Sequence, residues 1–289
     1  MSLSDLLDGC FRGLRATFGP VLVLVLVLVA PLTLLSNLTL SRIAPATFEN
    51  PFGLPADGAP PPGMGEPFAL IGVSSVVGIV TYIVTLAISA AVVVMVLDVD
   101  QGREADLGEA VRGALGVLGT TLGASLLLLA GGIAVGLGFI FLSVITAFIP
   151  IAGIIFVVLV MLPLGLALMV VFFATTSLVV PIAVAERNGV TETLGRVWWV
   201  LRMRFWRVIG VTLLIGLLVL AVTGGLQFGF TLLAVLVPAG DWVVASVGEA
   251  AAQLVSIPVS AFAALLIYLD ARIRLEGLDV QLRARGITA

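Results

Sequence analysis

A short polar stripe interrupts the last apolar stretch of the chain, and it is the strongest candidate for chemistry inside the membrane. Glu249, Gln253 and Ser256 are spaced four and three residues apart, so they share one face of a helix. Gln227 belongs to the preceding apolar stretch. An ionisable side chain in a membrane helix is costly to expose to lipid and typically faces a polar site. We therefore predict an intramembrane polar site formed by these four residues, with an interfacial position of Glu249 as the alternative.

Residues 189–210 contain a second set of candidate residues, which are arginines beside tryptophans. Guanidinium groups can bind lipid phosphates, and tryptophan rings anchor helices at the membrane interface. The alternative is that these arginines only set the topology. The candidate anchors for anionic phospholipid headgroups are Arg196, Arg202, Arg204, Arg207, Trp198, Trp199 and Trp206.

The chain has no histidine, no lysine and one cysteine, so several kinds of chemistry lack their usual residues. Without histidine, imidazole acid–base catalysis is excluded and the usual zinc sites lack their ligands. The glycine-rich run 131–138 lies within an apolar stretch, where it favours helix packing over nucleotide binding. Cys10 is interpreted as a small buried hydrophobe. The sequence therefore predicts no catalytic residue, no cofactor and no metal site.

The elements that position these residues are long apolar segments. Of the 289 residues, 61% are hydrophobic and 11% are charged, and the mean hydropathy is +1.26. Several apolar runs longer than about 18 residues are typical of membrane helices. We predict an all-α polytopic membrane protein with six transmembrane helices arranged as three hairpins. The predicted spans cover residues 18–40, 68–97, 119–148, 153–181, 207–237 and 243–269, with bends at Pro163 and Pro258.

The distribution of arginines predicts which side of the membrane each loop occupies. Thirteen of the fourteen arginines precede span one, lie between spans two and three or four and five, or follow span six. Only Arg42 lies on the other side. Because arginine-rich loops stay in the cytoplasm, we predict a multi-pass protein of the bacterial cytoplasmic (inner) membrane with both termini in the cytoplasm.

A cytoplasmic amphipathic helix at the membrane interface is predicted before each hairpin. Residues 189–210 show the pattern most clearly, and we expect this helix to continue without a break into span five. Its predicted apolar stripe comprises Val190, Leu194, Val197, Trp198, Leu201 and Phe205. Asp5, Glu109 and Glu192 each follow a capping position by three residues, and the first two resemble a capping box. We predict three repeats of one unit, an interfacial helix plus a hairpin, over residues 1–100, 104–187 and 189–274.

The second span of each hairpin ends in acidic residues close to an arginine. The three places are Asp98 and Asp100 with Arg103, Glu186 with Arg187, and Asp270 with Arg272. The recurrence of this pattern favours the threefold repeat.

Two segments lie outside the predicted spans and interfacial helices. The proline- and glycine-rich residues 41–66 form an external loop, which either only connects two spans or offers a contact surface through Phe48, Phe52 and Met64. Residues 270–289 are predicted to form a cytoplasmic C-terminal tail. We interpret residues 1–289 as a single membrane domain.

Three segments of the chain carry a resemblance to known proteins. They are PIAVAER at 181–187, GVTETLGRVWWVLRMRFWRVIG at 189–210 and YLDARIRLEGLDVQLRARG at 268–286. With them the chain resembles bacterial integral membrane proteins of the glycerophosphodiester phosphodiesterase membrane-domain type and the YciC-like family of uncharacterised six-span proteins. In fused enzymes of this type, a separate barrel domain with histidine and metal-binding carboxylates hydrolyses the phosphodiester. Since this chain has no histidine, the resemblance implies a membrane module without that activity.

These features together predict a non-enzymatic inner-membrane protein that acts as a scaffold or accessory subunit in envelope or lipid physiology. The alternative is a transporter or lipid-handling protein with the polar site around Glu249 between the hairpins. The expected partners are the lipid bilayer with its anionic phospholipid headgroups, and another membrane protein or a second copy of the chain. We expect no binding of nucleic acid.

Overall fold

The described residues of the protein are almost all helical, and they form no β-strand. This computed structural model describes residues 15, 17–43, 65–100, 103, 106–147, 153, 155–237 and 240–276. Within these ranges, six helices are long and apolar enough to cross a membrane: Thr17–Ile43, Ser74–Val99, Leu107–Thr146, Val157–Glu186, Val190–Leu236 and Asp241–Leu275. The prediction of a helical, polytopic membrane protein is confirmed.

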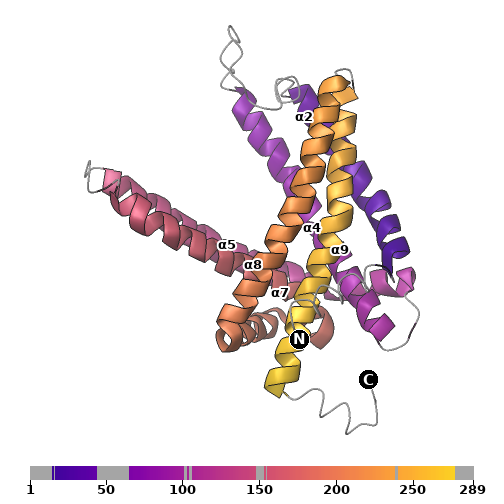
Figure 1. Ribbon diagram of the computed structural model, residues 1–289, viewed down its shortest axis with the longest axis vertical. Helices are drawn as coiled ribbons and strands as arrows, with labels where there is room; N and C mark the ends of the chain where they lie inside the picture. The colour runs from indigo at the N-terminus through magenta and orange to yellow at the C-terminus, as the bar shows by residue number, and fades with distance from the viewer. Residues whose placement is uncertain are drawn as a thin grey trace.

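The helices follow one another as three hairpins (Figure 1). The first hairpin contains η1 (Val25–Val29), α2 (Ala30–Ile43) and α4 (Gly65–Asp100). The second contains α5 (Leu107–Ala147), η2 (Val157–Met161) and α7 (Leu162–Glu186). The third contains α8 (Val190–Leu236) and α9 (Asp241–Glu276). Every predicted span therefore falls on one helical segment.

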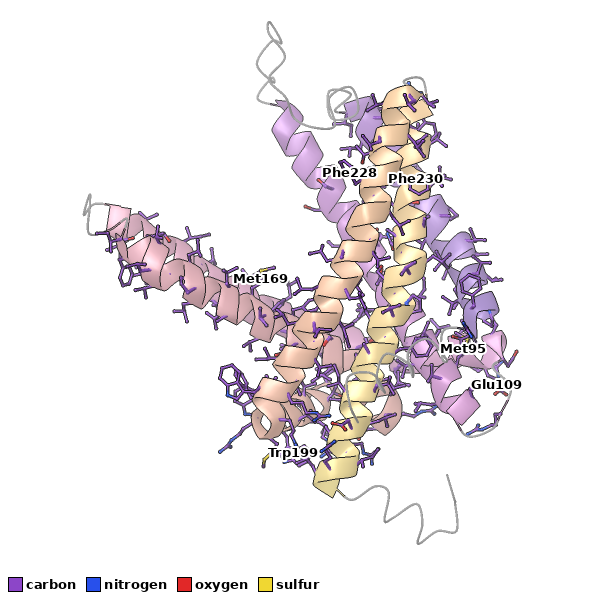
Figure 2. The ribbon with its side chains drawn as sticks, viewed as in Figure 1. Met95, Glu109, Met169, Trp199, Phe228 and Phe230 are labelled. Carbon is purple, nitrogen blue, oxygen red and sulfur yellow. The ribbon has the colours of Figure 1, made fainter. Side chains whose placement is uncertain are left out.

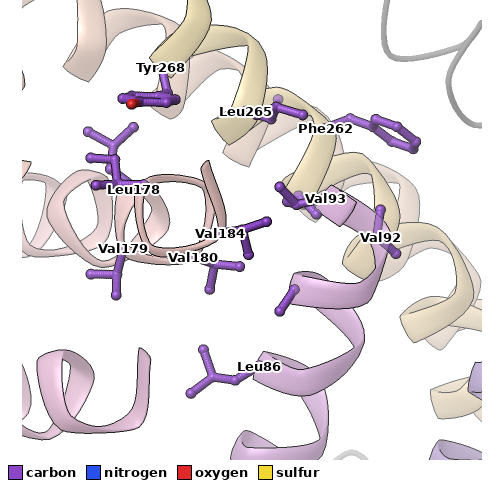
Figure 3. Close-up of a cluster of buried hydrophobic side chains, with 14 of the residues drawn as sticks. Leu86, Val92, Val93, Leu178, Val179, Val180, Val184, Phe262, Leu265 and Tyr268 are labelled. Carbon is purple, nitrogen blue, oxygen red and sulfur yellow. The ribbon is translucent and has the colours of Figure 1, made fainter. Parts of the chain in front are cut away.

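The hydrophobic core lies where α4, α7 and α9 meet, and each of these is the second helix of its hairpin (Figure 3). Val92 and Val93 of α4, Leu178 of α7, and Phe262 and Leu265 of α9 are among its buried side chains. Lipid tails are as apolar as these side chains, so removal from water does not drive the helices together. Close van der Waals packing stabilises the cluster instead.

The second hairpin diverges from the other two beyond this core (Figure 1). In the most apolar 18-residue stretch of α5 no residue is buried. In the corresponding stretches of the fourth span, which contains α7, and of α9, 11% and 50% of the residues are buried. The two helices of the hairpin pack closely on each other, because a Cβ at Gly132 of α5 would lie 2.9 Å from the ring of Phe172 of α7. Their other sides carry exposed apolar side chains.

Two π-helical turns precede prolines within spans. η1 ends two residues before Pro31, and η2 ends two residues before Pro163. In a regular α-helix the ring of a proline collides with the carbonyl group four residues earlier. A π-helical turn is wider and leaves space for the ring, so both spans continue as helices beyond their prolines. α9 also continues past Pro258, but without a π-helical turn.

The second and third predicted interfacial helices form the first parts of α5 and α8, which begin at Leu107 and Val190, each two residues before the acidic residue Glu109 or Glu192. Asp106 Oδ2 accepts a hydrogen bond from the Glu109 backbone N–H at 3.0 Å, so the cap predicted for α5 is confirmed. The expectation of an unbroken α8 was wrong: Arg204 leaves helical geometry with φ −132° and ψ 32°. α8 is therefore divided by a bend at Arg204, between the predicted interfacial segment and the predicted span.

The apolar stripe predicted for α8 is only partly buried. Val197 and Leu201 belong to the core, whereas Trp198 is 63% exposed. α9 extends to Glu276, so the segment predicted as a tail begins as helix. The predicted first interfacial helix at residues 1–14, Cys10, the loop residues 44–64 and the tail residues 277–289 lie outside the described residues.

Candidate functional site

Most described arginines gather at one end of the molecule, where α4, α7 and α9 finish and α5 and α8 begin. We call this the arginine-rich end; Figure 2 shows Glu109 and Trp199 there. Its described arginines are Arg103, Arg112, Arg187, Arg196, Arg202, Arg204, Arg207, Arg272 and Arg274.

Glu186 joins three helices at this end. Its Oε1 atom accepts hydrogen bonds from Arg196 Nε at 2.8 Å and from the Tyr268 hydroxyl at 2.5 Å. Its Oε2 atom accepts a third bond from Asn188 Nδ2 at 3.0 Å. The side chains of Glu186 and Arg196 are 15% and 22% exposed, and Tyr268 is buried. One carboxylate at the end of α7 therefore holds α8 and α9 in place.

Asp270 and Asp98 occupy corresponding positions at the ends of α9 and α4. Asp270 binds Arg207 Nε through Oδ2 and Arg274 Nε through Oδ1, both at 3.0 Å. Asp98 pairs with Arg103 at 3.4 Å, so these two residues, which are close in the sequence, also meet in the structure. The other pairings required the structure, because Glu186 binds Arg196 ten residues further on instead of its neighbour Arg187.

The predicted lipid anchors divide into two groups. Arg196 and Arg207 are in ion pairs with carboxylates of this chain, and Arg196 also lies over the ring of Trp199, 4.5 Å from its centroid. Arg202 is exposed, Trp206 is 82% exposed, and Arg204 lies at the bend of α8. Arg202, Trp198 and Trp206 are thus the members best placed to reach headgroups, and that role stays a prediction.

The structure brings only part of the predicted intramembrane site together. Glu249 Oε1 accepts a hydrogen bond from Gln253 Nε2 at 3.3 Å, and Glu249 Oε2 accepts one from Asn37 Nδ2 at 3.1 Å. Gln227 is exposed, and among the described contacts neither it nor Ser256 bonds to Glu249. Asn37 of α2 was missed by the sequence reasoning, since nothing in the sequence pairs α2 with α9. Buried Thr33 and Ser246 exchange hydrogen bonds along the same contact.

A pocket of about 390 Å³ lies at the arginine-rich end, between α4, α5 and the end of α7. It is lined by Val94, Asp98, Arg103, Glu109, Arg112, Gly113, Gly116, Val117, Thr120 and Arg187. The six α5 residues recur at spacings of three, one, three, one and three, so they form one helix face. This face of polar and small residues was a signal available in the sequence, but the helices that enclose it were not.

Chemistry at these places is that of carboxylates, guanidinium groups and amides. Within the described residues, no group of three or more His, Cys, Asp or Glu side chains is placed to hold a metal ion. No family model, curated protein or solved structure significantly matches the chain. The functional argument therefore rests on the contacts described above.

Proposed function

We propose that this chain is a non-enzymatic protein of the bacterial cytoplasmic membrane that acts as a scaffold or accessory subunit in envelope or lipid physiology. In this proposal the arginine-rich end and both termini face the cytoplasm. The repeated unit of interfacial helix plus hairpin, and the resemblance to glycerophosphodiester phosphodiesterase membrane domains, belong to the same proposal. The observation that carries it is the divergence of the second hairpin from the bundle.

The diverging part of α5 and α7 offers a surface for other membrane helices. Leu137, Ile140 and Phe141 of α5, Leu159 of η2 and Met169 of α7 are each between 61% and 69% exposed. A Cβ at Gly136 of α5 would meet nothing within 4 Å. Small residues let a second helix approach closely, and large apolar side chains on either side supply van der Waals contact. The second hairpin thus supports a docking role within the membrane.

Photo-crosslinking in the native membrane tests this role. With a photoreactive residue at Phe141 or Leu159, we expect a protein adduct of one defined size. Leu220 of α8 is a matched control, because it is 65% exposed in the span of the third hairpin. Adducts to lipid alone at every position, or the same protein adduct from Leu220, would show that the second hairpin has no dedicated partner.

A second candidate function, transport or lipid handling, is favoured by the contact between Asn37, Glu249 and Gln253. These three side chains place a carboxylate and two amides where α2 and α9 touch within spans one and six. Polar groups of this kind inside a membrane commonly mark the path of an ion or a polar headgroup.

Reconstituted vesicles carrying fluorescent phosphatidylglycerol test this second function. We expect the protein to move the probe between leaflets, and Glu249→Gln to slow it about tenfold by removing a charge-assisted interaction. Gln227→Leu is the control, because Gln227 is exposed and outside the hydrogen-bonded group. A wild-type protein that moves no probe, or an unchanged rate in Glu249→Gln, argues against lipid handling.

A further inference from the structure

We infer that the pocket between α4, α5 and the end of α7 binds a phosphate-bearing anion, held by Arg112 and Arg187. This site is separate from the diverging part of the second hairpin and from the Glu249 contact. It goes beyond the proposed scaffold role, so either proposal can fail alone.

The charges that line the pocket favour an anion. Three guanidinium groups face two carboxylates there, and Arg103 is already paired with Asp98 at 3.4 Å. Arg112 and Arg187 are exposed, and neither forms an ion pair with any described residue. A guanidinium group presents several N–H donors in a plane that matches two phosphate oxygens, so two such groups form a natural phosphate clamp.

The wall that α5 contributes leaves room for the ligand. Gly113 and Gly116 lie on the pocket face without side chains, and a Cβ at Gly116 would meet nothing within 4 Å. One turn further along, Thr120 adds a hydroxyl group that can donate to a phosphate oxygen. The volume of about 390 Å³ exceeds the need of a bare ion and falls within the usual range for small-ligand sites.

The backbone at Arg187 is a second, independent observation. Arg187 ends α7 with φ 51°, and it is the one non-glycine residue with positive φ in the described parts of the chain. Its N–H donates to the Ala183 carbonyl oxygen at 3.0 Å, which closes the helix. Glycine is the residue that takes this conformation without strain. Strained residues of this kind cluster at ligand sites, and here the strain places a guanidinium group in the pocket.

The position of the pocket is compatible with two sources of phosphate, a phospholipid headgroup and a soluble phosphate compound. It opens at the arginine-rich end, where the exposed Trp198 and Trp206 match the headgroup level of a bilayer. A phospholipid headgroup and a soluble phosphate compound present the same chemistry at this level. The test must therefore separate them.

Thermal unfolding of the full chain in detergent, measured with different ligands, distinguishes a phospholipid headgroup from a soluble phosphate compound. The probes are inorganic phosphate, phosphatidylglycerol and phosphatidylcholine, because a ligand that binds the folded state raises Tm with its concentration. We expect phosphatidylglycerol or inorganic phosphate to raise Tm well above the effect of phosphatidylcholine. A larger effect of phosphatidylglycerol identifies a lipid headgroup as the source, and an equal effect of inorganic phosphate identifies a soluble compound.

Three variants connect the binding to this pocket. Arg112→Gln and Arg187→Gly should each weaken the apparent affinity about tenfold, the loss of one charge-assisted contact. Arg187→Gly should also keep or raise the Tm without ligand, because glycine relieves the strained backbone. Gly116→Leu should weaken binding by filling the pocket, with no change of charge.

The control is Arg202→Gln, which removes the same charge from an exposed position outside the pocket. The inference is overturned if neither anion raises Tm more than phosphatidylcholine does. It is also overturned if Arg202→Gln weakens binding as much as Arg112→Gln, or if Gly116→Leu binds like the wild type.

Discussion

The second and third hairpins contain the same kinds of segments, yet they pack differently. Each begins with a long helix that starts at the arginine-rich end, and α7 and α9 each carry an acidic residue there, Glu186 and Asp270. α8 bends at Arg204, whereas α5 runs as one helix from Leu107 to Ala147. After the bend, α8 stands beside α9, while α5 leads its hairpin away from the bundle (Figure 1). The two hairpins therefore differ both in this bend and in whether their spans stay beside the other helices.

The contacts of the two hairpins differ in the same way. The third hairpin meets the first through Ser246 and Thr33 and through Glu249 and Asn37, far from the arginine-rich end. Among the described contacts, the polar contacts between the second and third hairpins lie at the arginine-rich end, chiefly at Glu186. Glu186 is therefore the main polar link between the second and third hairpins.

Glu186→Ala should have the largest effect on stability, because it removes this polar link between the hairpins. It leaves the Arg196 guanidinium and the Tyr268 hydroxyl without their shared acceptor in a poorly solvated place. We expect the free energy of unfolding to fall by about 3 kcal/mol. Denaturation in detergent micelles, followed by circular dichroism, measures the loss.

Glu192→Ala is the matched control for this variant. Glu192 is an exposed carboxylate in the first turn of α8, and it accepts one hydrogen bond from the Gly189 N–H at 3.2 Å. Its loss should cost less than about 1 kcal/mol, as expected for a helix-capping contact. Equal losses of unfolding free energy in the two variants would mean that Glu186 does not link the second and third hairpins.

Gly248→Ala should have the next largest effect, because it forces the third hairpin apart. The new Cβ would lie 2.6 Å from Phe230 Cβ, an atom fixed close to the α8 backbone. Overpacking outweighs the better helix propensity of alanine, so we expect a net loss of about 1–2 kcal/mol in the same denaturation assay.

Gly132→Ala provides the matched contrast in the second hairpin and should have the smallest effect. Its Cβ would lie 2.9 Å from Phe172 Cε2, which is the far end of a ring that can move aside toward lipid. We expect a change of less than about 0.5 kcal/mol. A loss as large as that of Gly248→Ala would show that Phe172 is held as firmly as Phe230, and this contrast between the two hairpins would fail.

The spans and caps could be predicted because they depend on neighbouring residues. The predicted span 68–97 lies within Gly65–Asp100, and the cap at Asp106 follows from its spacing to Glu109. The bend at Arg204 could not be predicted, since no proline or glycine marks it.

The candidate sites show the same limit. Helical spacing places Gln253 next to Glu249, but Asn37 lies 212 residues earlier in the chain and reaches Glu249 only because α2 packs on α9. Arg187 is the sequence neighbour of Glu186, but in the structure Glu186 binds Arg196 and Arg187 lines the pocket. Long-range partners of this kind leave no mark on local spacing.

The sequence by itself determined the class of protein, the positions of the six spans and the gathering of arginines at one end. These properties depend on local hydrophobicity and charge, which decide how each segment meets a membrane. Only the tertiary structure decided which carboxylate meets which arginine, where the pocket opens and that the second hairpin diverges. Inside a membrane all apolar helix faces are equally compatible with lipid, so close packing and a few polar contacts select among them.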